Sequence, residues 1–214
     1  MRIRRRVVSF GRLGLGFAAL VLTAMPAARA QTTARSAWGL FSARYDTHTS
    51  DFIYALYGYG HSFAMVGTLQ NPRSGWTELV GAVGRSVSIV GQPGQSIAAG
   101  VAHASDGWYG QLYFVPAFRL GPTWVRATAE WDVPISNGGV TQFALSPASL
   151  TIPVIRTIEA GVSMDLASAQ RARTSIAIGP ELRVAIPGAV VGTDLQRMTD
   201  GSTSRLRFFF VTQF

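Results

Sequence analysis

Along most of the chain, apolar and polar residues alternate with a period of two, in runs separated by turn-forming residues. The segment Thr123–Val133 shows this most clearly: its even positions hold Trp, Arg, Thr, Glu and Asp, and the odd positions from 125 hold Val, Ala, Ala, Trp and Val. Val154–Leu166 and Arg171–Ile186 separate in the same way. Because successive side chains of a β-strand point to opposite faces, these runs predict strands with one polar and one apolar face.

Turn chemistry divides the chain into twelve predicted strands, with a Pro-containing link before Val154. They are Arg35–Tyr45, Phe52–Tyr59, Ser62–Gln70, Trp76–Val90, Ser96–Ala104, Trp108–Leu120, Thr123–Val133, Val140–Ser146, Val154–Leu166, Ala172–Ile186, Ala189–Arg197 and Thr203–Phe214. An even number brings both termini to one end of the sheet, together with the tight turns Gly121-Pro122 and Pro187-Gly188. Merging Phe52–Gln70 or losing the short strand Ala189–Arg197 gives ten strands, and eight also remain open.

Residues 1–30 have the organisation of a secretory signal peptide. Several arginines precede the apolar run Leu13–Met25, and the small-residue site Ala28-Arg29-Ala30 predicts cleavage before Gln31. The apolar run is shorter than the roughly 20 residues that a membrane-spanning helix needs. We therefore expect residues 1–30 to be removed and residues 31–214 to form a single folded domain.

Charge and cysteine content narrow the possible functions. Six of the 19 basic residues lie in residues 1–30, which leaves 13 arginines against 11 acidic residues and a net charge of +2 instead of +8. The basic balance of the whole chain is therefore no argument for nucleic-acid binding. The chain has no cysteine, which excludes disulfides, thiolate metal sites and a lipidated N-terminus.

The last predicted strand carries a further signal. Leu206, Phe208, Phe210 and Phe214 fall on one face with Thr212, while Arg205 and Arg207 fall on the other. A terminal Phe after alternating apolar residues resembles the last strand of bacterial outer-membrane β-barrels. Thr212 departs from that pattern. The resemblance implies that this strand is the assembly signal read by the barrel-insertion machinery.

Taken with the export signal, this strand predicts an all-β fold, a closed antiparallel transmembrane β-barrel of about 12 strands in the outer membrane of a Gram-negative-type bacterium. A charge facing lipid at mid-bilayer costs roughly 2–4 kcal/mol, so the polar faces must point into the lumen. The lumen-facing charged residues are predicted to be Arg126, Glu130, Asp132, Glu159, Asp165, Arg173, Glu181, Arg183, Arg205 and Arg207. Arg85 breaks the alternation of its strand, at a bulge or at the membrane interface.

These charges allow two interpretations. Close Arg–carboxylate pairs would fill a narrow barrel, whereas segregated signs would line a water-filled path for small charged solutes. The expected partners are outer-membrane lipids, the insertion machinery and such solutes, without nucleic acid and without a cofactor or metal.

An enzyme is the main alternative. His103-Ala104-Ser105 resembles the His-x-Ser tripeptide of outer-membrane lipid hydrolases, in which the His takes the Ser proton. Those families place an orienting Asn or Glu on the neighbouring strand, where this chain has Ala117 and Phe118. The sequence thus favours a structural barrel or a narrow channel over catalysis. A soluble periplasmic β-protein that binds a small ligand shows the same alternation and stays a third alternative.

Overall fold

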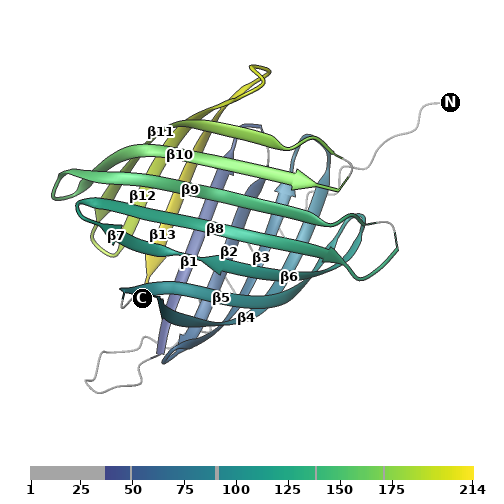
Figure 1. Ribbon diagram of the computed structural model, residues 1–214. Coiled ribbons are helices and arrows are strands. Elements are labelled where there is room, and N and C mark those ends of the chain that lie inside the picture. The colour runs from purple at the N-terminus through teal and green to yellow at the C-terminus, as the bar shows by residue number, and fades with distance from the viewer. Residues whose placement is uncertain (1–36, 49, 90–91, 138, 171) are drawn as a thin grey trace, which may run out of the picture.

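The computed structural model describes residues 37–48, 50–89, 92–137, 139–170 and 172–214, which form one antiparallel sheet (Figure 1). Its strands are β1 (Ala37–Asp46), β2 (Asp51–Tyr59), β3 (Ser62–Asn71), β4 (Trp76–Ile89), β5 (Gln92–Ala104), β6 (Gly107–Val115), β7 (Ala117–Leu120), β8 (Thr123–Pro134), β9 (Gln142–Ile155), β10 (Ile158–Ala169), β11 (Ser175–Ile186), β12 (Ala189–Met198) and β13 (Ser204–Gln213). In this described part of the chain, no helix has the length and apolar character needed to cross a membrane.

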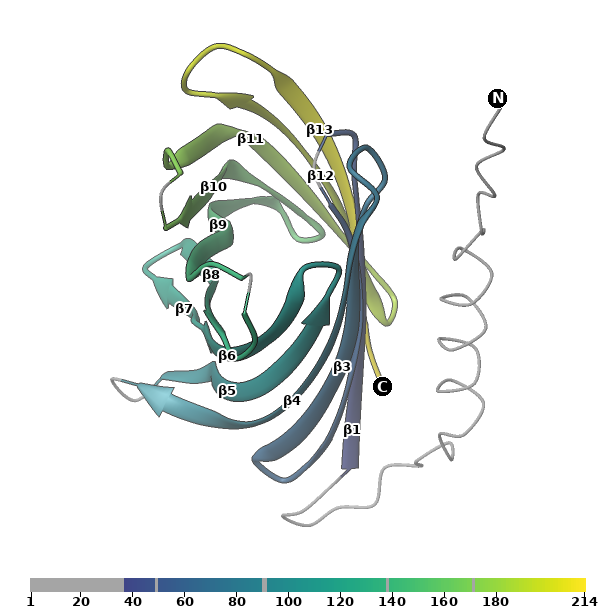
Figure 2. The same ribbon diagram turned by 90° about the vertical axis from the view of Figure 1, so that its right-hand side faces the viewer.

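The sheet closes on itself (Figure 2). Except between β6 and β7, each strand pairs with the next along the chain, and β1 pairs with β13 from Leu40↔Gln213 to Asp46↔Arg207. β6 and β7 are two parts of one strand interrupted at Pro116, and both pair with β8. The fold is therefore a closed antiparallel barrel of twelve strands, as the alternation predicted.

The structure corrects the predicted strands around residues 140–166. The expected Pro-containing link is part of β9, which continues through Pro147 and Pro153 to Ile155, and the chain turns at residues 156–157 instead. Both prolines lie where the ladder is irregular: the β9–β10 register shifts between Met164 and Leu166 and again between Ile158 and Glu159. A proline lacks an amide hydrogen and is tolerated in a sheet at such bulges, so it did not end the strand.

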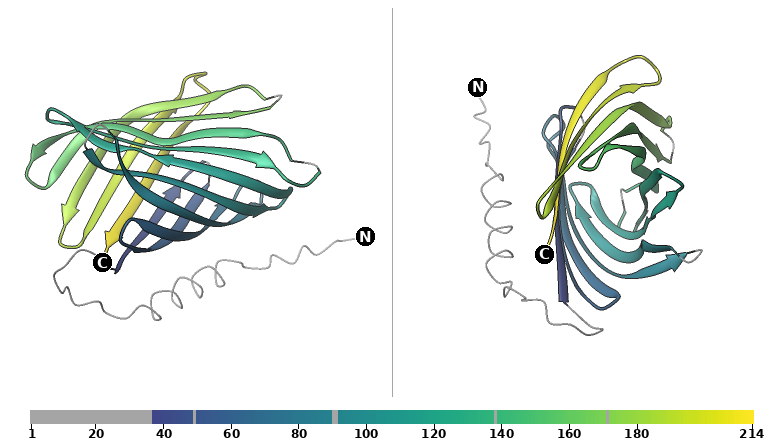
Figure 3. Two further views of the ribbon diagram at one scale, coloured as in Figure 1. Left: turned by 60° about the horizontal axis from the view of Figure 1, so that its bottom comes forward. Right: turned by 90° about the vertical axis from the view of Figure 1, so that its left-hand side faces the viewer.

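The turns gather at two ends of the barrel (Figure 3). The antiparallel order places the turns after β2, β4, β7, β9 and β11 at the end where β1 begins and β13 finishes. Two of them are the tight turns predicted at Gly121 and Gly188, whose φ angles of 59° and 76° favour glycine. The loops after β1, β3, β5, β8, β10 and β12 lie at the opposite end. The predicted signal peptide, residues 1–30, and residue Arg35 lie outside the described residues.

The outer surface of the barrel is apolar. Large side chains that are about half exposed or more occur on every wall, among them Leu79, Val83, Val101, Leu112, Leu150, Ile178, Leu195 and Phe208. They alternate along their strands with buried polar residues such as Glu78, Gln111, Ser149 and Gln196. A soluble protein would bury the apolar face, so this inside-out distribution is that of a barrel surrounded by lipid.

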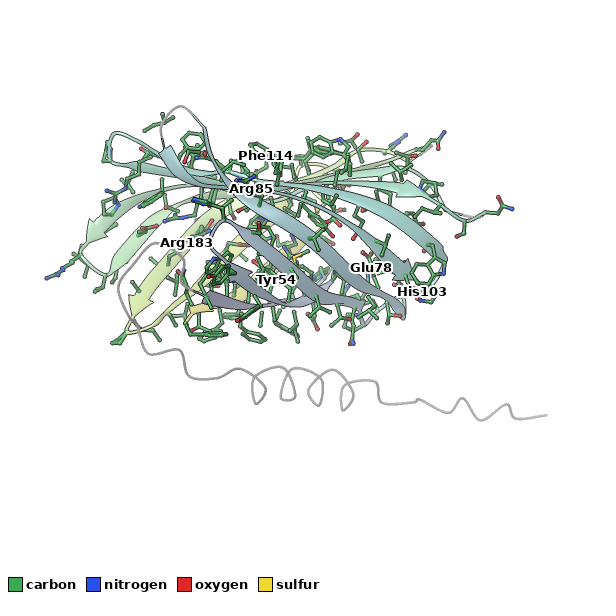
Figure 4. All side chains as sticks on the ribbon, turned by 90° about the horizontal axis from the view of Figure 1, so that it is seen from below. Tyr54, Glu78, Arg85, His103, Phe114 and Arg183 are labelled. Carbon is green, nitrogen blue, oxygen red and sulfur yellow. The ribbon has the colours of Figure 1, made fainter. Side chains whose placement is uncertain are left out.

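Arg85, which breaks the alternation, lies on this outer surface of β4 (Figure 4). It sits in regular register opposite Ser62 and Ile97, so no bulge explains it. Its neighbour Ser86 donates its amide to His61 in the turn after β2 at 2.7 Å. Arg85 is therefore level with that turn at the end of the barrel that carries the termini, where a long side chain can extend its charge away from the apolar band.

Candidate functional site in the barrel interior

The interior holds nine of the ten predicted lumen charges, which contact polar partners on the same strand or on strands nearby. They are Arg126, Glu130, Asp132, Glu159, Asp165, Glu181, Arg183, Arg205 and Arg207. Arg173 is placed elsewhere: it is exposed in the loop that precedes β11. β11 begins at Ser175, whereas the alternation predicted a start at Ala172, so Arg173 lies outside the sheet.

The densest group of ion pairs lies between β13, β12 and β10. Arg207 donates two hydrogen bonds to Asp194, from Nη2 at 2.7 Å and from Nε at 2.9 Å, and a third from Nη1 to Asp165 at 2.5 Å. Arg205 donates to the same Asp165 and lies 3.7 Å from Asp46 on β1. The side chain of Arg207 is 1% exposed, so this part of the lumen is filled and dry.

A second group lies nearer the end that carries the termini. Arg126 on β8 binds Glu159 on β10 through both terminal nitrogens, at 2.9 and 3.2 Å. Arg183 pairs with Glu181 and also donates to Ser149 at 3.1 Å. The side chains of Arg126 and Glu159 are each 24% exposed. These two side chains are therefore partly accessible to solvent, in contrast to the buried group around Arg207.

The third group is acidic. The side-chain amide of Gln111 donates to Glu78 at 2.7 Å, to Glu130 at 2.9 Å and to Asp132 at 3.0 Å. The Tyr113 hydroxyl in turn donates to the Gln111 carbonyl oxygen at 2.6 Å. In the described chain, no arginine lies within ion-pair distance of these three carboxylates. We call these three carboxylates with Gln111 the acid group.

The wall beside the acid group is apolar on its inner face. Val80 and Ala82 of β4 pack against small side chains of β5 and tyrosines of β6, all buried. The inner face of β3 adds the partly buried Met65 and Leu69. The lumen of this barrel is thus narrowed by packed side chains on both walls rather than open along its whole width.

Several interior residues escaped the sequence prediction. Arg44, Asp46, Glu78 and Asp194 all face the lumen. Their strands carry only one or two charges each, so the alternation had too little contrast to assign a face. Asp194 pairs with Arg207 in the β12–β13 register, and paired residues share a face of the sheet. Aligning these two strands from their turn would therefore have assigned Asp194 to the lumen.

The residues of the hydrolase alternative are not arranged as a catalytic pair. His103 lies on the outer face of β5 with its ring 4.6 Å from that of Trp108 (Figure 4). The Ser105 hydroxyl is bonded to Thr77, whose main-chain amide donates to it at 2.9 Å. Each side chain therefore has a neighbour other than the one that the tripeptide predicted. The described residues also contain no cluster of His, Asp and Glu suited to a metal ion.

Comparison with known proteins places this chain by fold. No family model matches it, and no curated protein matches it. Among solved structures, the KdgM porin matches with a TM-score of 0.56 at 8% identity, over 83% of this chain and 99% of that chain. The NanC porin matches with a TM-score of 0.54 at 10% identity, over 81% and 98%. Omp33, an outer-membrane protein of Acinetobacter baumannii, matches with a TM-score of 0.50 at 13% identity, over 86% and 100%.

These likenesses define the class of the molecule: it has the fold of a bacterial outer-membrane porin barrel. At 8–13% identity they show the fold alone. The role of this barrel must therefore be inferred from its own interior.

Proposed function

We propose that this protein lies in the outer membrane of a Gram-negative-type bacterium and acts as a narrow channel for small charged solutes. The observation that carries the proposal is the distribution of side chains: the outer face is mostly apolar, while most of the Arg, Asp and Glu residues of the strands point inward. An inward charge costs less free energy where water reaches it, and the partly exposed pair Arg126–Glu159 marks such a wet region.

A structural, non-conducting barrel is the second candidate, and one observation favours it. The Arg207 ion pairs are buried and connect three strands across one part of the lumen. A buried network of this kind blocks the space that it fills, although Asp165 Oδ1 is buried there without a hydrogen-bond partner. The acid group differs, because its carboxylates have no arginine partner among the described residues. Segregated charge of this kind favours a conducting path through the half of the lumen that it lines.

The test combines location, folding and conductance. The protein is expressed with its full N-terminal segment, and outer-membrane fractions are run on gels with and without heating. A folded barrel migrates differently before and after boiling. The purified protein is then reconstituted in planar bilayers. Discrete current steps support the channel, whereas a heat-modifiable protein that never conducts supports the structural barrel.

The same material tests the two remaining alternatives. A soluble periplasmic protein would be released without detergent. A lipid hydrolase would cleave phospholipid in mixed micelles and would lose that activity on replacing Ser105. We expect no such activity, because the Ser105 hydroxyl is hydrogen-bonded to Thr77 and the His103 ring lies against the ring of Trp108.

A further inference from the structure

A single side chain joins opposite walls of the barrel. Arg44 on β1 donates a hydrogen bond from Nη1 to the hydroxyl of Ser146 on β9, at 3.0 Å. In the order of the closed sheet, β1 and β9 are separated by β13, β12, β11 and β10 on one side and by β2 to β8 on the other. The two residues therefore belong to nearly opposite strands. We call this hydrogen bond the cross-lumen contact.

The contact requires the two walls to approach each other. Twelve strands spaced about 4.8 Å apart around a circle give a diameter of at least about 18 Å, which strand tilt widens further. A single arginine and a serine do not cover that distance. The barrel is therefore pinched at this level, and β1 and β9 come close together there.

The local structure of β9 explains the approach. In the ladder with β8 the register shifts between Ala127 and Ala129, and in the ladder with β10 it shifts between Met164 and Leu166. Both shifts lie opposite Ser146 and Pro147, so β9 carries an extra residue against both neighbours. Such a bulge bends the strand and re-aims a side chain.

Ser146 lies between two residues that face lipid. Leu145 and Ala148 pair with the outward residues Leu166 and Met164. Alternation from Leu145 directs Ser146 inward, whereas alternation from Ala148 would direct it outward. The extra residue of the bulge reconciles the two, so that the Ser146 hydroxyl faces the interior, where it meets Arg44, while Ala148 still faces lipid.

Arg44 also differs from the other lumen arginines. Arg126, Arg183, Arg205 and Arg207 each bind a carboxylate, whereas in the described chain Arg44 forms no ion pair and bonds to a neutral hydroxyl. Its Nε is buried without a hydrogen-bond partner. Its charge lies 5.8 Å from the centre of the Phe52 ring. Arg44 is thus a positive charge in the lumen held by few polar contacts.

The cross-lumen contact divides the interior into two parts. The half bounded by β10 to β13 contains the buried ion pairs of Arg205 and Arg207. The half bounded by β2 to β8 contains the acid group. Any passage along the β2–β8 half is limited in width at the level of Arg44, and the guanidinium there opposes the acid group in sign.

We propose that Arg44, held by Ser146, is the residue that sets both the width and the ion selectivity of the channel. This inference rests on the proposed channel function. Removing the side chain joins the two halves and leaves a lumen in which carboxylates outnumber arginines further. We therefore expect a wider and more cation-selective channel, because rings of acidic side chains favour cations.

Conductance of four variants in planar bilayers tests this. Arg44→Ala is expected to raise single-channel conductance about twofold or more and to shift the reversal potential in a salt gradient toward cations. Arg44→Met keeps most of the length without the charge, so it should shift selectivity with a smaller gain in conductance. Ser146→Ala should raise conductance while leaving the charge in place. Arg85→Ala removes the same charge from the outer face and should leave both quantities unchanged.

Because an Arg44 variant can misassemble, the contact is also tested inside a folded channel. The chain has no cysteine, so Arg44→Cys introduces a single thiol. A positively charged methanethiosulfonate added to the reconstituted variant should lower its conductance back toward the wild-type level. Equal conductance in wild type, Arg44→Ala and Ser146→Ala, or no change on modifying the cysteine, would overturn the proposal.

A third measurement separates this inference from the channel function. In the double variant Arg44→Cys, Ser146→Cys, a short bifunctional maleimide should link residues 44 and 146 in the folded barrel. The pair Arg85→Cys, Ser146→Cys should not be linked, because residue 85 is on the outer face. A link without conductance in any variant refutes the channel while leaving the contact between the walls in place. Conductance without a link refutes the contact and leaves the channel.

Discussion

Phe214, the last residue, is hydrogen-bonded to Gly39 in the first strand through both main-chain groups. The Gly39 amide donates to the Phe214 carbonyl at 2.7 Å, and the Phe214 amide donates back to the Gly39 carbonyl at 3.0 Å. The Phe214 ring covers Gly39, where a Cβ atom would collide with it. The terminal aromatic residue therefore takes part in closing the barrel, on the lipid-facing side.

This closure gives the first prediction, on the assembly signal proposed for Leu206, Phe208, Phe210 and Phe214. Phe214→Ala removes the ring that covers the β1–β13 junction, so the folded, heat-modifiable fraction in the outer membrane should fall several-fold. Phe209→Ala is the matched control. Phe209 lies on the same strand but faces the lumen, where the centre of its ring lies 4.9 Å from Cζ of Arg183. It should assemble at the wild-type level. Equal assembly of the two variants would refute the role of the outward aromatic face.

A second prediction concerns the buried ion pairs. Arg207→Met leaves Asp194 buried, with a side chain 2% exposed, and without its two hydrogen bonds from the guanidinium. An unpaired buried charge of this kind costs about 3–5 kcal/mol of unfolding free energy. Urea unfolding in lipid vesicles, followed by tryptophan fluorescence, measures the loss.

Two further variants control that experiment. Adding Asp194→Asn to Arg207→Met should restore much of the loss, because no charge is then left unpaired between the two positions. Arg197→Met changes an exposed arginine of β12 and should stay within about 0.5 kcal/mol of wild type. If Arg207→Met lowered the unfolding free energy by less than about 1 kcal/mol, water would have to reach Asp194 in the folded barrel.

Most of this fold could be predicted from the alternation of polar and apolar residues, and the prediction fails where that alternation is interrupted. In strands with strong contrast, such as β8 and β11 from Ser175 onward, alternation separates a polar face from an apolar one, because a charge facing lipid is costly. Alternation fails where a bulge inserts a residue. Ser146, which faces Arg44, lies where β9 is bulged against both neighbours, and the proline at 147 suggested the end of a strand instead. Which strands meet across the lumen depends on closure and pinching of the whole sheet, which no local pattern encodes.

The acid group gives a third prediction. The Gln111 amide is the shared donor of Glu78, Glu130 and Asp132. Gln111→Leu leaves these carboxylates without that donor, and each buried acceptor that loses its partner costs about 1–3 kcal/mol. The variant should unfold at lower urea concentration. Adding Glu130→Gln should recover part of the loss by supplying a new amide and removing one negative charge. A stability equal to wild type would mean that water already solvates the acid group.

The last prediction tests which surface faces lipid. Val101 is 49% exposed on the outer face of β5, opposite Gly81, which in turn pairs with Val66 near the middle of β3. An arginine at that depth should cost about 2–4 kcal/mol of unfolding free energy, compared with about 0–1 kcal/mol near the membrane interface. Val101→Arg should therefore be strongly destabilised in lipid vesicles, while Arg85→Leu, level with a turn, should change stability by less than about 1 kcal/mol. If Val101→Arg were as stable as wild type, the outer band of this barrel would not lie in hydrocarbon, and the membrane assignment itself would be wrong.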